Sequence, residues 1–420
     1  MSNAKVLAGV RVLEHGTFIT GPAASMLLAD LGAEVVKVEQ PEGDPFRAFR
    51  GGSYSPHYQT YNRNKKSVRL DTRKPEDLKL FDTLVGEADV YIQNFRPGVA
   101  AKIGAGEARL RELNPGLVYC AISGFGPDGP SAARPSYDTV AQAASGFLKL
   151  LVNPANPRVV GPAIADALTG FYAALGILGA LVERERKAGG GGQGRPDTDG
   201  GAALGRPNIE SGALGRPNIQ SGALGRRVEV SMFEAMTHFN LDAFTHLFSE
   251  GEVMGPYSRP SVSQSYVLKC SDGQWIALHM SSPPKFWEGL AKAIGQPDLF
   301  DDARFATREA RIDNQETLIG VLGAHFAREP RAEWCRRLEA LDVPHAPMYE
   351  TNEVPEDAQA KHLQLFVDAP HPGKPGTRWT TVRSPLSFDG ERSLEVTAPP
   401  LLGDHDGALR SGRSLWSPRP

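Results

Sequence analysis

The carboxylate of Asp166 stands at the head of the most apolar helical stretch of this 420-residue chain, residues 161–182, and the next charge is Glu183. An acidic residue there either accepts backbone N–H groups as a helix N-cap or carries out chemistry. With an ordinary pKa of about 3.9, the carboxylate is ionised at neutral pH and can act as a nucleophile without a neighbouring base. A thioester suits it as a target, because a thiol of pKa about 8.5 leaves readily as a thiolate.

Four other segments offer binding groups, and each also has a purely structural interpretation. G-T-F-I-T-G-P (16–22) is either a phosphate cradle or a tight turn. R-N-K-K-S-V-R-L-D-T-R-K (63–74) is either the rim of a polyphosphate pocket or a solvated edge. N-F-R-P-G (94–98) either stacks on a base and pairs with phosphate or starts a loop. P-S-Y-D (135–138) opens a helix, in which Asp138 has a capping role as its simplest interpretation.

The elements that would position these residues alternate between strands and helices. Apolar patterns predict strands at 10–14, 34–39, 67–71, 88–95 and 117–126, with helices at 23–31 and 75–85 between them. Such alternation indicates an α/β fold with a mostly parallel sheet, whose binding loops follow the carboxyl ends of the strands.

The sequence divides into four predicted regions. Residues 1–187 form a large Rossmann-like ligand-binding domain in our interpretation, and residues 188–227 a Gly-rich loop that contains a ten-residue repeat, A-L-G-R-P-N-I-E-S-G. Residues 228–330 hold a linker and a smaller domain, with a hairpin expected at 265–279. Residues 331–420 are expected to return to the large domain.

Composition limits the function classes. A net charge of −3 with mixed signs favours neither nucleic acid nor an anionic membrane as a partner. The apolar run near 163–182 is interrupted by polar and Gly residues and predicts a buried helix rather than a membrane span. Three dispersed cysteines and ten histidines without metal-ligand spacing argue against disulfides and a bound metal, so we expect a cytoplasmic protein.

Seven segments, taken in order, resemble the class III CoA-transferases, which include formyl-CoA transferase and carnitine CoA-transferase. They are G-V-R-V-L-E…G-P…L-L-A-D-L-G-A-E-V-V-K-V-E-Q-P, N-R-N-K-K-S-V-R-L-D, A-D-V-Y-I-Q-N-F-R-P-G, N-P-G-L-V-Y-C-A-I-S-G-F-G, Y-D-T-V-A-Q-A-A-S-G, the Asp166 helix and A-P-P-L-L-G-D-H. The resemblance covers nearly the whole chain outside 188–226.

The resemblance implies a fold and a reaction. The fold is an interlocked, ring-like homodimer, in which each subunit has a Rossmann-like large domain and a smaller α+β domain. The residue matching the family's nucleophile is Asp166, which would attack an acyl-CoA, form a mixed anhydride and then an aspartyl-CoA thioester, and pass CoA to a small carboxylate. CoA is then a substrate and carrier, with no permanently bound cofactor, and succinyl-CoA is one candidate donor.

The resemblance also implies CoA contacts, although two departures from the family pattern affect the site. The matching positions are Ile19, Thr20, Leu70, Asp71, Thr72, Arg73, Asn94, Phe95, Arg96, Lys102, Ser136, Tyr137 and Asp138. Gln40 stands where formyl-CoA transferase has an arginine. Residues 281–287, S-S-P-P-K-F-W, lack the glycine run of that enzyme, so oxalate is not the expected acceptor.

Three alternatives remain. The α-methylacyl-CoA racemases resemble this chain throughout, but they carry a histidine where Tyr137 stands, and proton exchange at carbon needs such a base. A catalytically inert CoA-binding protein is the second alternative. An NAD-dependent dehydrogenase is the weakest, since no dinucleotide fingerprint follows the first strand.

Overall fold

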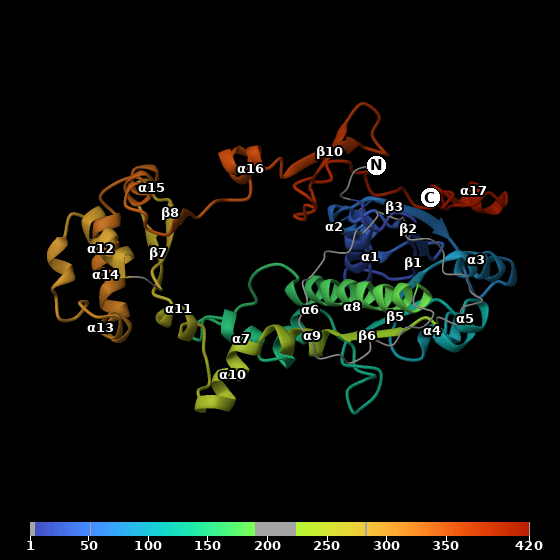
Figure 1. Ribbon diagram of the computed structural model, residues 1–420, viewed down its shortest axis with the longest axis horizontal. Helices are drawn as coiled ribbons and strands as arrows, with labels where there is room; N and C mark the ends of the chain where they lie inside the picture. Colours follow the sequence, from blue (N-terminus) through green and yellow to red (C-terminus); the bar gives the residue numbers. More distant parts are fainter. Residues whose placement is uncertain (1–4, 51, 190–223, 282–283, 420) are drawn as a thin grey trace, which may run out of the picture. The chain divides into compact units, whose positions relative to one another are not determined.

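The computed structural model describes residues 5–50, 52–189, 224–281 and 284–419. The chain forms two compact units (Figure 1): Met1–Phe147, Gly161–Asn240 and His362–Pro420 make up the first, and Leu148–Val160 and Leu241–Lys361 the second. The chain thus returns to the first unit at His362, whereas the sequence suggested residue 331. Most of the predicted repeat-containing loop, residues 190–223, lies outside the described residues.

The first unit is built on a six-stranded parallel sheet with the order β3-β2-β1-β4-β5-β6. This is the strand order of doubly wound α/β folds, so the predicted fold class is confirmed for this unit. The strands are β1 (Arg11–Glu14), β2 (Glu34–Glu39), β3 (Lys65–Arg69), β4 (Val90–Gln93), β5 (Val118–Ser123) and β6 (Arg227–Ser231).

Alternate side chains of the strands belong to two hydrophobic cores, one on each face of the sheet. Val12 and Ile92 pack on one face against α1 (Thr20–Asp30) and α8 (Ile164–Gly189). Leu13 and Tyr91 pack on the other face against α3 (Pro75–Glu87) and α5 (Glu107–Leu113), and Figure 1 shows the helices on these two sides. The two-residue period of a strand explains why neighbouring residues serve opposite cores.

The other helices of this unit are short. They are η1 (Pro45–Ala48), α2 (Pro56–Tyr61), α4 (Val99–Lys102), α6 (Asp138–Ala144), α9 (Met232–Phe239) and α17 (Asp406–Arg410), with α7 (Phe147–Leu151) at the boundary between the units. The C-terminal part adds α16 (Ala358–His362) at the other boundary and an antiparallel pair, β10 (Phe366–Pro370) and β11 (Arg378–Val382).

Helix α8 is the one described helix long and apolar enough to cross a membrane by length and composition alone. Its Ala173, Ile177 and Leu181 nevertheless lie in the core, against α1 and the sheet. The helix is therefore the buried core helix that its sequence predicted.

The second unit has its own core around an antiparallel sheet of β7 (Ser265–Lys269), β8 (Trp275–His279) and β9 (His345–Pro347). The predicted hairpin at 265–279 is confirmed. Trp334 and Leu338 of α15 (Arg331–Ala340) are buried in this core, which explains why residues 331–361 stay with this unit. Its other helices are α10 (Leu241–Glu250), α11 (Ser258–Val262), α12 (Pro284–Ala293), η3 (Pro297–Phe300), α13 (Arg308–Asp313), α14 (Gln315–Phe326) and η4 (Val354–Glu356).

Candidate active site

A cavity of about 330 Å³, called here the Asp166 cavity, lies within the first unit at the carboxyl ends of β1, β4, β5 and β6. In doubly wound sheets, ligands bind at this edge, where the strand order reverses between β1 and β4. The lining residues are Thr17, Phe18, Ile19, Thr20, Asn94, Phe95, Arg96, Pro97, Val99, Ile122, Ser123, Gly124, Ala132, Arg134, Ser136, Tyr137, Asp166 and Met232.

Asp166 is the third residue of α8 and does not cap that helix. The capping is done by Asp138, whose Oδ1 accepts the backbone N–H groups of Ala165 (2.8 Å) and Asp166 (3.4 Å), while Gln142 Nε2 donates to its Oδ2 (2.6 Å). Within the described parts of the chain, the Asp166 carboxylate accepts no hydrogen bond. Asp138, 28 positions earlier in the sequence, thus fills the N-cap role that the sequence left open for Asp166.

The pKa of Asp166 departs from the ordinary value assumed from the sequence. Burial, with a smaller contribution from the Asp138 charge, raises the pKa of Asp166 to about 7. The same two carboxylates, after burial, raise the pKa of the Tyr61 hydroxyl. A carboxylate that titrates near neutrality is more basic than a free aspartate and is therefore a stronger nucleophile once ionised.

Seven of the predicted CoA contacts line the Asp166 cavity: Ile19, Thr20, Asn94, Phe95, Arg96, Ser136 and Tyr137. Asn94 holds the loop that carries the first two, since its Oδ1 accepts the Thr17 N–H (2.9 Å) and its Nδ2 donates to Thr17 O (2.7 Å) and Thr20 Oγ1 (2.9 Å). The Ser136 hydroxyl is buried and has no hydrogen-bond partner among the described residues. An unpaired hydroxyl of this kind is suited to a ligand atom.

The other predicted contacts lie outside this cavity. Leu70 is fully buried, Asp71 pairs with Arg73 (2.7 Å), and the Thr72 hydroxyl is buried without a described partner. Lys102 ends α4 and is exposed. Asp138 does not line the cavity and instead caps α8. A CoA-binding role for these residues remains a prediction.

Beyond Asp166 and the seven predicted contacts, ten further residues line the cavity, and Arg134, Ser123 and Gly124 are three of them. Arg134 is exposed, and its guanidinium lies 4.8 Å from the centre of the Phe125 ring. Ser123 and Gly124 end β5, and a Cβ on Gly124 would come within 2.5 Å of Ser136 Cβ, so only glycine fits there. The S-G-F-G-P-D-G-P turn (123–130) after β5 was interpreted from the sequence as a structural loop, and its glycines are the signal that could have marked this wall.

Among the described residues, no group of three potential metal ligands lies at this cavity. The one described cluster of three is His246, Glu250 and Glu252, on and after α10 in the second unit. The two glutamates of that cluster are exposed, and acidic surface groups of this kind are common without a metal.

Comparison with known proteins places the chain in a family. The profile of CoA-transferase family III matches residues 7–195 and 217–406. The formyl-CoA:oxalate CoA-transferase of Streptomyces avermitilis is 32% identical over 97% of this chain and 95% of that protein. The human succinyl-CoA:glutarate CoA-transferase is 30% identical over 96% of this chain and 85% of that protein.

Solved structures agree with the sequence comparisons. The crystal structure of a CAIB/BAIF family protein from Brucella suis superposes with a TM-score of 0.78 at 28% identity, covering 97% of this chain and 98% of that one. The chain belongs to the CoA-transferase family III and is a CoA-transferase enzyme.

Proposed function

We propose that this enzyme moves CoA from an acyl-CoA to a free carboxylate through covalent bonds to Asp166. The observation that carries the proposal is a partly buried carboxylate without a described partner, in a cavity at the edge of the sheet where ligands bind. The pKa of about 7 supports it, because the carboxylate is basic and is still substantially ionised at neutral pH.

The proposed reaction has four steps. A carboxylate oxygen of Asp166 attacks the thioester carbonyl, the C–S bond breaks, and CoA leaves as a thiolate from a mixed anhydride. The thiolate attacks the aspartyl carbonyl, which releases the donor carboxylate and leaves an aspartyl-CoA thioester. The acceptor carboxylate attacks that thioester and regenerates the thiolate. The thiolate then attacks the acceptor's carbonyl, giving the new acyl-CoA and free Asp166.

The two arginines that line the cavity, Arg96 and Arg134, favour the binding of anionic substrates. Neither Arg96 nor Arg134 forms an ion pair with a carboxylate in the described residues, and both line the cavity with Asp166. Unpaired guanidinium groups suit the phosphates of CoA or a substrate carboxylate. A short dicarboxylate such as succinate is the expected substrate class, and succinyl-CoA and glutarate are named for the human relative.

The racemase alternative is less well supported. Both relatives with stated activities are CoA-transferases by name. Tyr137 stands at the racemases' histidine position and lines the cavity, and a neutral phenol is a poorer general base than an imidazole.

We also propose a cytoplasmic homodimer, interlocked as the family resemblance implies. Phe171, Leu175 and Val182 of α8 follow one face of the helix and are half or more exposed. A row of exposed apolar side chains of this kind commonly marks a protein interface. Molar mass in solution tests this part of the proposal, and a monomer at micromolar concentration would contradict it.

The catalytic proposal is tested with Asp166→Asn and a control, Asp82→Asn, which replaces a partly exposed carboxylate outside the cavity. Donor and hydroxylamine are mixed with each protein, and peptide mass spectrometry locates any hydroxamate. We expect release of the CoA thiol from the donor to fall by on the order of 1,000-fold or more in Asp166→Asn and to stay near wild type in the control. Full thiol release by Asp166→Asn, or a protein adduct at another residue, would overturn the assignment.

A further inference from the structure

Phe18 has an unusual backbone in the wall of the Asp166 cavity. Its φ is 60°, in the left-handed region that residues other than glycine rarely adopt. Glycine stands nearby at 16 and 21, so the loop does not lack conformational freedom. Strained residues that persist at a site often have a role there. A phenylalanine in this conformation therefore points to a requirement for its ring.

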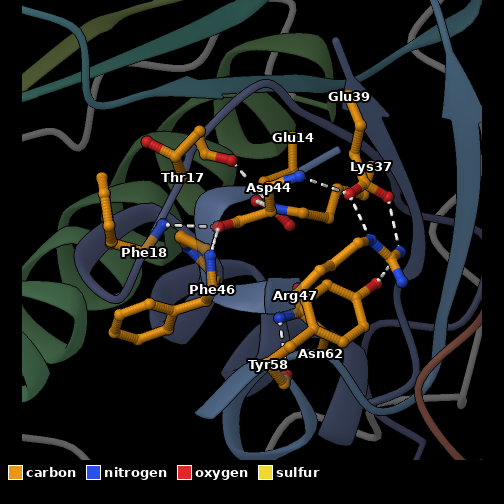
Figure 2. A network of polar contacts seen from close by, with 12 residues as sticks. Glu14, Thr17, Phe18, Lys37, Glu39, Asp44, Phe46, Arg47, Tyr58 and Asn62 are labelled. Carbon is orange, nitrogen blue, oxygen red and sulfur yellow. Dashed lines mark hydrogen bonds and ion pairs between the residues drawn. The ribbon is translucent and has the colours of Figure 1, made fainter. Parts of the chain in front are cut away.

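The conformation of Phe18 is held by a buried carboxylate. Phe18 N–H donates to Asp44 Oδ1 (3.2 Å), which also accepts the Phe46 N–H (2.9 Å) as the N-cap of η1. The second oxygen of Asp44 lies 3.0 Å from Lys37 Nζ, and both side chains are fully buried. Figure 2 shows Asp44 between the Phe18 backbone and the ammonium group.

Asp44 belongs to a buried cluster of three carboxylates and three cations. Lys37 and Lys65 donate to the two oxygens of Glu14 (2.7 and 2.8 Å), and Glu39 receives a two-point ion pair from Arg47 (2.7 Å each). The charges balance inside the protein, as buried ions require. Burial would raise the pKa of Glu14, but the two lysines lower it to about 2, so Glu14 is ionised at neutral pH.

The same cluster fixes both ends of the loop that carries Phe18. Lys37 Nζ donates to Gly16 O (2.8 Å), and Lys65 Nζ donates to Pro22 O (2.9 Å). Together with the Asp44 bond to Phe18, the anchors span the segment from residue 16 to residue 22. The position of the Phe18 ring is thus determined by buried charges rather than by the ring's own contacts alone.

The ring of Phe18 is the centre of an aromatic wall. It meets Tyr137 edge-on at a centroid distance of 5.9 Å and Phe46 at 5.2 Å. Phe46 in turn contacts Phe49 (5.2 Å), which does not line the cavity. Phe18 and Tyr137 line the cavity together with Asp166.

We propose that Phe18, positioned by Asp44, is a specificity-determining residue that contacts the acyl group. Its ring selects acyl groups with an apolar body of two or more carbons beyond the carbonyl over the acetyl group. The proposal rests on the proposed function, because the thioester carbonyl must come within about 3–3.5 Å of an Asp166 oxygen. In a cavity of about 330 Å³, the carbons attached to that carbonyl lie against the surrounding walls. Each methylene that leaves water for an apolar wall gains about fourfold in binding.

The test uses only the donor half-reaction, so that no acceptor needs to be known. Acetyl-, butyryl-, hexanoyl- and succinyl-CoA are given to the enzyme with hydroxylamine, and release of the CoA thiol is followed. We expect wild type to prefer hexanoyl- to acetyl-CoA in kcat/KM. We expect Phe18→Ala to lower that ratio by about tenfold or more, Phe18→Leu by less, and the matched control Phe49→Ala by less than about twofold.

The ratio is measured on one protein preparation, so partial unfolding of a variant does not change it. An unchanged ratio in Phe18→Ala, or a wild type that prefers acetyl-CoA, would refute the proposal. A uniform loss for all donors with weaker binding of free CoA would also refute it, because the ring would then contact the pantetheine arm. If wild type releases no thiol from any donor, the proposed function itself fails.

The positioning role of Asp44 has a separate test. Asp44→Asn keeps an oxygen that can accept the Phe18 N–H, whereas Asp44→Ala does not, and both remove the charge. We expect the donor ratio of Asp44→Asn to stay closer to wild type than that of Asp44→Ala. If Asp44→Ala melts at a lower temperature with an unchanged donor ratio, Asp44 is structural only and this part is wrong.

Discussion

Replacing Asp166 by asparagine should stabilise the folded protein, and the gain should grow with pH. The substitution keeps the size of the side chain and removes its charge. The described residues donate no hydrogen bond to this carboxylate, so no favourable contact is lost. What disappears is the cost of an ionised group that is partly buried and lies beside Asp138.

The magnitude follows from the pKa. The pKa of Asp166 is about 7 in the folded protein against an ordinary 3.8. One pKa unit corresponds to ~1.4 kcal/mol, so above pH 7 the ionised carboxylate lowers the free energy of unfolding by at most about 4 kcal/mol.

The sign follows from which state binds the proton. Between about pH 4 and pH 7, the unfolded chain has lost the proton and the folded protein keeps it, so stability falls as pH rises through this window. At about pH 5.5 the cost is about 2 kcal/mol, and at about pH 8 it is about 4 kcal/mol. The advantage of Asp166→Asn over wild type should therefore grow by about 2 kcal/mol between these values.

Urea unfolding of both proteins at fixed concentration, at about pH 5.5 and about pH 8, measures this difference. Asp138→Ala is a useful contrast, because it removes the acceptor that caps α8 and should lower stability at both pH values by about 1 kcal/mol. A stability difference between wild type and Asp166→Asn that is the same at both pH values would refute the raised pKa. A less stable Asp166→Asn would show that the carboxylate has a structural contact.

Three further predictions concern the same unit. The pH dependence of kcat/KM reports the pKa values of the free enzyme, so kcat/KM for the donor should rise with pH, with a midpoint near 7. A flat profile from about pH 5.5 to pH 8.5 would contradict a pKa of about 7 for Asp166. Gly124→Ala should reduce donor turnover by about tenfold or more because its Cβ meets Ser136. Because Ser136 is itself a predicted contact, the double variant with Ser136→Gly should match Ser136→Gly alone, and a double variant less active than Ser136→Gly would exclude that clash as the cause. Lys37→Met removes a buried cation that pairs with Glu14 and Asp44, so the free energy of unfolding, measured in urea, should fall by about 3–5 kcal/mol. A loss under about 1 kcal/mol would show that the cluster tolerates an unbalanced buried charge.

Local patterns predicted the sheet well. The strand expected at 34–39 coincides with β2, and the hairpin expected at 265–279 is formed by β7 and β8. Helix α1 begins at Thr20, three residues before its apolar pattern, because Gly21 and Pro22 form its first turn. Strand and helix periods are properties of neighbouring residues, so sequence alone reveals them.

The site depended on partners that are distant in sequence. The basic run at 63–74 offered a solvated edge or a phosphate rim, yet Arg63 pairs with Asp30 (2.5 Å), and Lys65 is buried on Glu14. The cap of α8 comes from Asp138, which no local pattern connects to that helix. The pKa of Asp166 likewise depends on burial and on Asp138, neither of which the local sequence shows.

The contacts between the β3 edge of the sheet and residues 397–416 affect the order in which the two units can fold during synthesis. Thr397 N–H donates to Asn64 Oδ1 (2.8 Å), Asp406 accepts from Arg69 (2.7 Å), and Trp416 is buried in the same core as Leu13. The segment drawn in red in Figure 1 therefore completes a core whose strands left the ribosome some 350 residues before it. The second unit, with its core confined to Tyr266–Val343, has all its core residues available earlier. During translation, the core residues of the second unit are therefore made before residues 397–416, and until those residues follow, the core of the first unit on the Leu13 face of the sheet lacks part of its cover.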